Sequence, residues 1–383
     1  MSNQTVKSTL RSLGRFNGVS SALLGPSRRQ FSTTCRRDIR ATFEMTENPE
    51  LNHVLKTIQD KIVLPAHLPA KQRKMVFDTK QRGRLEQNPV ILDIEDLEHK
   101  FEPIDRFKDL PNAKKMLRLA LSKMETSEDW KNLPILLTGY KQAQIKLSPV
   151  EWASTVRKAC DSGNVHIILE CAKQPEATGL NISHPDIAAL LLSFLNDRTV
   201  VTNMDAAETT QSLKFCETIL DLLARPQHAP ATHTAKLARA ENNKLFRGLV
   251  LFARLSLLKS EIQAEAATDR LSLLAQDEVD RLTTLWGDSH QSNLEELSDI
   301  SLLSPKQTST PTDSNLSGFY YTRVIAQNIR ALADAQQLLD SDASKLQPIQ
   351  KALQEHLGNV VKANSSKAES WGKEYETIVG AAL

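Results

Sequence analysis

Glycine is scarce in this sequence, with 13 in 383 residues, and aromatic residues make up 5% of it. Enzymes that hold phosphates or nucleotides need glycine where the backbone approaches the ligand, and the patterns G-x-x-x-x-G-K-[ST] and G-x-G-x-x-G are both absent. The hydrolase and metalloprotease patterns G-x-S-x-G and H-E-x-x-H are absent too. We therefore predict a non-catalytic protein without a cofactor, and a hydrolase or transferase is the least favoured class.

Cysteine and long apolar runs are also lacking. Four cysteines occur, and the three beyond residue 38 (Cys160, Cys171 and Cys216) show no C-x-x-C spacing. An odd number without that spacing argues against both a zinc site and a disulfide framework, so we predict small buried hydrophobic residues and no metal. No segment approaches the ~20 apolar residues of a membrane span. The sequence predicts no integral membrane span.

Acidic residues are missing from residues 1–37. This stretch instead holds seven basic residues: Lys7, Arg11, Arg15, Arg28, Arg29, Arg36 and Arg37. Serine, threonine and an apolar stripe accompany them, which is the composition of a mitochondrial transit peptide. We predict a transit peptide over 1–38, with processing near Phe31, and a matrix location; peripheral attachment to the inner membrane stays open. The alternative is a disordered basic tail.

Removal of residues 1–38 would change the sign of the net charge. The whole chain carries a formal charge of +2, whereas residues 39–383 carry 41 basic and 45 acidic side chains, or −4. A chain near neutrality is not suited to non-specific nucleic-acid binding over its whole surface. Any contact with RNA is therefore expected to be local.

The stretch from Ser148 to Asp197 shows the clearest helical pattern. Ser148 and Pro149 suit a helix start, and Gly163 suits the left-handed turn that ends a helix. A second helix follows as far as Pro175 and Gly179, and a third opens at His184-Pro185. The spacing predicts two helices in roughly 35 residues.

This unit resembles a pentatricopeptide repeat. Val150 to His184 matches the family's 35-residue length, with Trp152 near the start of the first helix and Gly163 between the helices. The 35-residue units before and after this one also predict pairs of helices, but they lack a glycine at the position of Gly163. The resemblance implies a protein of stacked helical hairpins that presents a concave face to protein partners or RNA. It places the RNA-reading positions at Ser154, His184 and Ala189, with Arg157 and Lys158 nearby for phosphates.

Residues 39–112 lack sustained helical periodicity. We expect an irregular extension with one short helix at 51–62, ended by Pro65 and Pro69, and a short strand or docking segment near 90–94. The extension also carries a candidate RNA-binding arm of six basic residues: Lys71, Arg73, Lys74, Lys80, Arg82 and Arg84. A solvated extension is the equal alternative. The acids and histidine at 95–102 could suggest a metal site, which we do not favour.

The rest of the chain predicts helices at 206–224, 243–266, 271–286, 318–339 and 346–361. A linker over 226–242, with His228 and His233, and a disordered loop over 287–317 interrupt them. Phe319, Tyr320 and Tyr321 are expected to anchor a helix in the core, with RNA stacking as the alternative.

The pattern as a whole predicts an all-α fold of helical-hairpin repeats, like an α-solenoid, with an irregular N-terminal extension. The expected regions are a transit peptide (1–38), an extension (39–112), a pentatricopeptide-like region (113–225), a linker (226–242) and a C-terminal helical region (243–383). The function that we predict is a non-catalytic matrix scaffold in mitochondrial gene expression, bound to the mitochondrial ribosome or to mitochondrial RNA. The alternative is a protein-binding assembly factor for a respiratory-chain complex that does not contact RNA.

Overall fold

The computed structural model describes residues 42–94, 97–202, 205–228, 240–305, 316–339, 345–364 and 367–382. Within these residues the fold is helical apart from one two-stranded antiparallel sheet, so the predicted all-α class is confirmed. The predicted transit peptide and its processing site lie outside the described residues.

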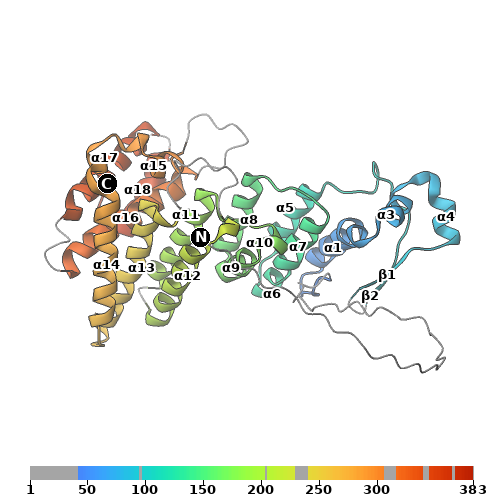
Figure 1. Cartoon of the computed structure of the whole chain (residues 1–383), viewed down its shortest axis with the longest axis horizontal. Coiled ribbons are helices and arrows are strands. Elements are labelled where there is room, and N and C mark those ends of the chain that lie inside the picture. The colour runs from blue at the N-terminus through green and yellow to red at the C-terminus, as the bar shows by residue number, and fades with distance from the viewer. Residues whose placement is uncertain are drawn as a thin grey trace, which may run out of the picture. The chain divides into compact units, whose positions relative to one another are not determined.

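Figure 1 shows the helices in the order in which they follow along the chain. The first part of the chain comprises α1 (Pro49–Ile58), a π-helical turn (Gln59–Val63), α2 (Leu64–His67), α3 (Ala70–Phe77), a 3₁₀ turn (Thr79–Gln81), α4 (Arg82–Gln87), β1 (Ile91–Ile94) and β2 (Leu97–Lys100). The middle part comprises α5 (Ala113–Lys123), α6 (Ser127–Trp130), α7 (Asn132–Gln142), α8 (Pro149–Asp161), α9 (Val165–Lys173), α10 (Pro175–Thr178), α11 (Pro185–Val201) and α12 (Ala206–Ala224). The last part comprises α13 (Lys244–Gln263), α14 (Asp269–Trp286), α15 (Ser298–Ser301), α16 (Gly318–Leu338), α17 (Gln347–Ala363) and α18 (Ala368–Val379).

The hairpin formed by α8 and α9 has the boundaries that the sequence predicts. Ser148 and Glu151 form a reciprocal capping box, in which the Glu151 carboxylate accepts a hydrogen bond from the Ser148 N–H at 2.7 Å. Gly163 has a φ of +75° between the two helices, and Gly179 has a φ of +79° after α10. A side chain other than glycine is strained at such angles, so both glycines fix where the chain turns.

One continuous core joins α1 and the π-helical turn to the helices from Ala113 onwards, as far as α18. In its centre α11, α12, α13 and α16 lie side by side (Figure 1). Buried amides connect them: the Asn196 Nδ2 donates to the Leu249 carbonyl and the Gln327 Nε2 donates to the Ser193 carbonyl, both at 2.9 Å. The helices before and after residue 235 therefore pack as one body, which the sequence alone does not reveal.

A second, smaller core lies at the N-terminal side of this body. Its buried members come from α2, α3, α4 and the residues on either side of the β1–β2 hairpin: Leu64, Leu68, Val76, Leu85, Val90, Phe101 and Ile104. In the hairpin, Ile91 pairs with Lys100 and Asp93 with Glu98. We call residues 64–110 the small unit.

The small unit corrects the expectation of an irregular extension with one helix. Each of its short helices gives only one or two side chains to the core, so no periodicity over many residues could form. Pro65 does not end the first helix but occupies the first turn of α2, where a residue without an N–H is tolerated. Pro69 precedes α3 directly. The predicted strand near 90–94 is confirmed as β1.

The described parts of two predicted breaks in the helical pattern pack against the core. Within the expected loop 287–317, residues 287–305 contain 3₁₀ turns and α15, and they bury Leu294, Ile300 and Leu303; residues 306–315 lie outside the described residues. Within the expected linker 226–242, His228 is 1% exposed, and its Nδ1 lies 3.3 Å from the Ile182 N–H. His233 lies outside the described residues. The apolar residues of these segments are separated by polar ones, so they show no helical period in the sequence. They are buried because they pack against the main core.

Candidate nucleic-acid interface

The exposed faces of α3 and α4 result from how few apolar residues these helices carry. In α3 only Val76 is buried, and in α4 only Leu85. The 3₁₀ turn between them is capped by Asp78, whose Oδ1 accepts a hydrogen bond from the Lys80 N–H at 3.0 Å. That bond, with one from Gln81, holds the pKa of Asp78 below its usual value. The other side chains of α3 and α4 are exposed, apart from three that are partly buried: Arg73, Met75 and Phe77.

Five of the six basic residues predicted for RNA binding lie exposed on these neighbouring elements. We call them the basic surface: Lys71, Lys74, Lys80, Arg82 and Arg84. No carboxylate of the described residues forms an ion pair with any of them within 4.0 Å. Their charges are therefore available to an anionic partner.

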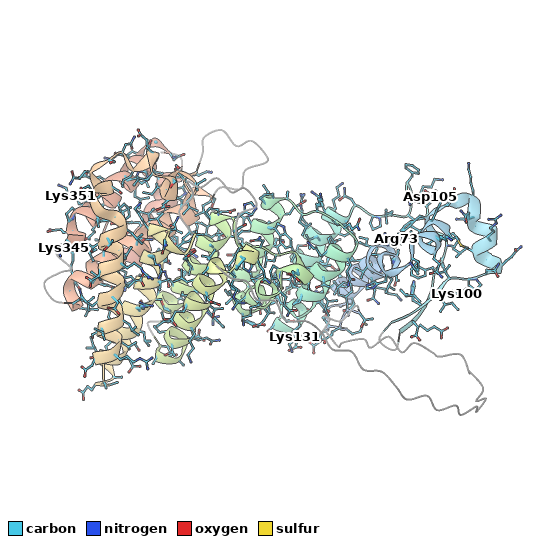
Figure 2. The ribbon with its side chains drawn as sticks, in the orientation of Figure 1. Arg73, Lys100, Asp105, Lys131, Lys345 and Lys351 are labelled. Carbon is cyan, nitrogen blue, oxygen red and sulfur yellow. The ribbon has the colours of Figure 1, made fainter. Side chains whose placement is uncertain are left out.

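Arg73, the sixth predicted residue, has a structural role. It is partly buried, and its Nη2 donates hydrogen bonds to the carbonyl oxygens of Ala66 at 3.0 Å and Leu68 at 3.2 Å. It thereby holds the turn between α2 and α3, which sets the position of α3. Figure 2 shows Arg73, Lys100 and Asp105 within the small unit.

The positions taken from the pentatricopeptide resemblance are only partly accessible. Ala189, on α11, is 0% exposed and belongs to the main core, so the prediction that it reads RNA is wrong. Ser154 and Lys158 are partly exposed on α8, and His184 is exposed at the start of α11. The Arg157 guanidinium lies 6.0 Å from the centre of the Tyr320 ring. α8 and α11 pack together, so all five residues lie on or at the start of neighbouring helices, and four of them are at least partly exposed.

The predicted aromatic cluster anchors α16 in the core. The Phe319 and Tyr320 rings lie 5.3 and 5.8 Å from the Arg323 guanidinium, and the Tyr321 hydroxyl lies 2.7 Å from His356 Nε2. Arg323 also pairs with Asp197 at 3.1 Å and with Glu374 at 2.6 Å. This cluster joins α11, α16 and α18, as the interpretation of core anchoring predicts.

The groups that could serve chemistry are dispersed. In the part of the chain that the structure describes, no three His, Cys, Asp or Glu side chains gather into a metal site. Cys160, Cys171 and Cys216 are free and buried, and burial raises the pKa of Cys171 to about 12. Such a thiol is protonated and unreactive at neutral pH, as a small core residue would be.

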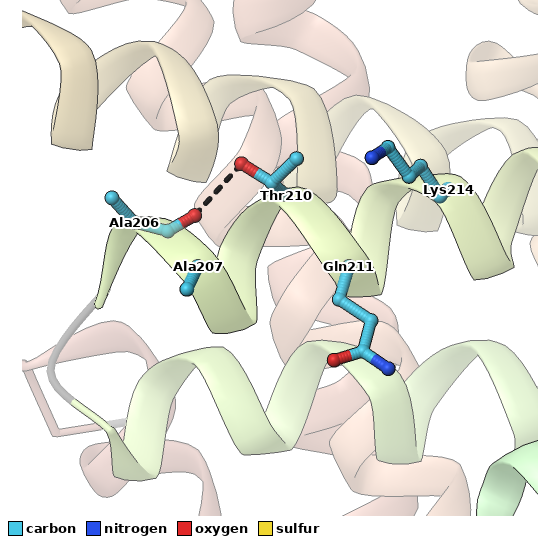
Figure 3. Close-up of a pocket in the computed structure, with 5 residues that line it drawn as sticks. All are labelled: Ala206, Ala207, Thr210, Gln211 and Lys214. Carbon is cyan, nitrogen blue, oxygen red and sulfur yellow. Dashed lines mark hydrogen bonds between the residues drawn. The ribbon is translucent and has the colours of Figure 1, made fainter.

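A hollow on α12 offers no converging polar groups (Figure 3). Its lining side chains come from α12 alone: Ala206, Ala207, Thr210, Gln211 and Lys214. The Thr210 hydroxyl already donates to the Ala206 carbonyl at 2.7 Å. We assign it no function.

Three consecutive residues of the small unit were not predicted as functional from the sequence. Arg106, Phe107 and Lys108 are all exposed on the turn that follows β2. An aromatic residue between two basic ones, inside a segment rich in acids, was the available signal.

Comparison with known proteins shows the family. The family described as mitochondrial ribosomal protein mS27 matches residues 29–378 of the chain. The chain belongs to this family. The mS27 match includes the small unit, α8 and the cluster around Arg323.

A curated member of the mS27 family gives a partial alignment. The small ribosomal subunit protein mS27 of Neurospora crassa is 32% identical over 182 residues, which is 48% of this chain and 46% of that protein. The chain thus aligns with about half the length of this relative. Among the described helices, none is long and apolar enough to cross a bilayer.

Proposed function

We propose that the protein is a non-catalytic component of the small subunit of the mitochondrial ribosome and acts in the matrix. The observation that carries the proposal is the match of the mitochondrial ribosomal protein mS27 family to residues 29–378. The name of the Neurospora crassa relative supports the assignment to the small subunit. A body of helices joined by one continuous core agrees with the role of a scaffold.

The basic surface of α3 and α4 is the part of the protein that we assign to ribosomal RNA. Its five side chains are exposed and form no ion pair within 4.0 Å with a carboxylate of the described residues, on a chain whose residues 39–383 are acidic overall. Each lysine or arginine that neutralises a phosphate releases a counterion, so a local group of this kind binds RNA without a basic surface elsewhere. We assign Arg73 no contact with RNA, because it holds the turn between α2 and α3 and so sets the position of this surface.

The helical hairpins form the second part of the proposal. Helices α5–α7, α8–α9 and α11–α12 succeed one another at the spacing of pentatricopeptide units, and Gly163 ends α8 as the repeat requires. We assign to these hairpins a repeat arrangement with protein partners along the helical face. Four predicted residues there are at least partly exposed and can add a polar contact: Ser154, Arg157, Lys158 and His184.

Gradient fractionation tests the function. Mitochondria that carry the tagged full-length chain are lysed in detergent and centrifuged through sucrose at low and high salt, with and without RNase. The proposal predicts sedimentation with small ribosomal subunits that persists at high salt. Sedimentation with a respiratory complex, unchanged by RNase, would refute it and favour an assembly factor.

A further inference from the structure

The turn that follows β2 is built to hold one side chain outwards. The Asp105 Oδ1 accepts a hydrogen bond from the Phe107 N–H at 2.8 Å, and the Asp109 Oδ2 accepts one from the Asp105 N–H at 3.0 Å. The backbone closes the turn with a bond from the Asp109 N–H to the Asp105 carbonyl at 2.8 Å. The Ile104 N–H donates to the Val76 carbonyl at 2.9 Å, which ties the turn to α3.

Phe107 is 98% exposed on this turn, more than any other large apolar side chain in the described part of the chain. Phe77 and Ile104, close to it in the fold, are partly or fully covered. Because burial of a phenylalanine stabilises a protein, an ordered turn that keeps one in water points to a bound partner.

A hollow of about 360 Å³ lies beside the Phe107 ring. Its walls combine aromatic and charged side chains from α3 and the turn: Lys74, Phe77, Asp78, Asp105, Arg106 and Phe107. The Arg106 guanidinium lies 5.2 Å from the centre of the Phe77 ring, which fixes its direction while its N–H groups stay exposed.

Two cations, Lys74 and Arg106, and two carboxylates, Asp78 and Asp105, line the hollow, so any preference for an anion comes from the further basic residues beside it. Asp78 caps the 3₁₀ turn and Asp105 holds Phe107, so each carboxylate accepts a hydrogen bond from a backbone N–H. Lys74 and Arg106 are exposed, and Lys108 follows on the same turn. The basic surface of α3 and α4 continues from Lys74.

We infer that this hollow binds an unpaired nucleotide of single-stranded RNA, with the base stacked on Phe107 and the flanking phosphates on Lys74, Arg106 and Lys108. An aromatic face beside basic side chains is how proteins hold unstacked bases. A duplex does not fit this use of Phe107, because its base faces are covered by their neighbours. The inference rests on the proposed ribosomal function and names the kind of RNA that the small unit contacts.

Binding of labelled oligonucleotides to the full-length chain tests the inference. The probes are an oligouridylate of about ten nucleotides and an RNA duplex of similar length. Phe107→Ala is expected to weaken oligouridylate binding about tenfold and to leave duplex binding unchanged. Phe107→Trp should keep the affinity, and the fluorescence of the introduced indole should be quenched by oligouridylate alone. Val201→Ala, at a side chain that is 77% exposed on α11, is the matched control and should bind as wild type.

Several results would overturn the inference. They are wild-type affinity of Phe107→Ala for oligouridylate, unquenched indole fluorescence of the Phe107→Trp variant in the bound state, or equal loss in the Val201→Ala control. Photo-crosslinking inside mitochondria from p-benzoylphenylalanine at position 107 should reach RNA; a crosslink to protein alone would also refute it. Sedimentation of the wild-type chain with small subunits, combined with any of these results, would leave the proposed function intact.

Discussion

Basic residues serve different purposes in the large helical body and in the small unit. In the body several arginines are buried and paired: Arg247 and Arg254 share Glu278 at 3.4 and 3.2 Å, and Arg323 lies between Asp197 and Glu374. On α3, α4 and the 3₁₀ turn between them, five basic residues face solvent and form no ion pair with a carboxylate of the described residues. Their clustering on neighbouring elements, rather than the number of charges in the chain, therefore marks where the chain can receive an anion.

The difference also has an energetic side. The paired arginines of the body are mostly buried, so removal of one leaves carboxylates uncompensated in a poorly solvated place. The charges of the basic surface repel one another in water and are relieved only when a partner binds. Substitutions in the two regions should affect different measurements, stability in one and binding in the other.

The largest effect on stability is expected from Arg323→Met. This change leaves Asp197 and Glu374 without their cation, which should lower the free energy of unfolding by about 3–5 kcal/mol. Urea unfolding measures it. Lys351→Met is the control, because Lys351 is 77% exposed and 3.9 Å from Glu355, and it should cost less than about 1 kcal/mol. Equal effects of the two changes would remove the distinction between the regions.

The second prediction concerns the basic surface. Replacement of its five residues by glutamine should reduce the slope of log affinity for RNA against log salt by about one for each lost phosphate contact. The urea midpoint should hardly change, because these side chains are exposed. The control replaces Lys351, Lys362 and Lys373 of the body. An unchanged slope in the basic-surface variant would show that α3 and α4 are merely solvated.

Gly163→Ala should destabilise the body by about 1 kcal/mol, since alanine is strained at a φ of +75°. A Cβ there would meet nothing within 4 Å, so the effect isolates backbone strain. Gly358→Ala in α17 also meets nothing, and it should instead stabilise by about 0.5–1 kcal/mol. The thermal midpoint distinguishes them; a shift in the same direction for both would contradict the assigned turn.

The smallest effect is a pH dependence from His356. Burial lowers the pKa of His356 in the folded protein, although Glu295 opposes the shift. The unfolded state then binds more protons as pH falls through about 6.5, so stability should decrease below that pH. His356→Gln should remove up to about 1.4 kcal/mol per pH unit of this dependence. Urea unfolding between pH 7.5 and 5.5 measures it, and identical profiles for variant and wild type would disprove the assignment.

The parts of the fold that follow from local chemistry were predictable. Ser148, Gly163 and an apolar stripe define the α8–α9 hairpin, because cap, turn and periodicity agree within a few residues. The small core was not predictable, since Leu64, Val76, Leu85 and Phe101 belong to separate short elements. The pairing of Arg323 depends on helices that are distant in sequence.

The candidate site shows the same limit. The clustering of basic residues on α3 and α4 was visible in the sequence, but the structural use of Arg73 depends on the turn at residues 66–68. The sequence around Ala189 already argued against its prediction as an RNA-reading residue. α11 is apolar on every side from Ile187 to Leu192, which is typical of a helix surrounded by others rather than one that exposes a reading face.

The most direct test of the account is a structure of the small mitochondrial ribosomal subunit isolated with the tagged chain, determined by electron cryomicroscopy. We expect density for the helices of the described residues, with Lys71, Lys74, Lys80, Arg82 and Arg84 against ribosomal RNA phosphates. Absence of the chain from the subunit would contradict the proposed function. Presence of the chain with α3 and α4 facing solvent would contradict the assignment of the basic surface to RNA.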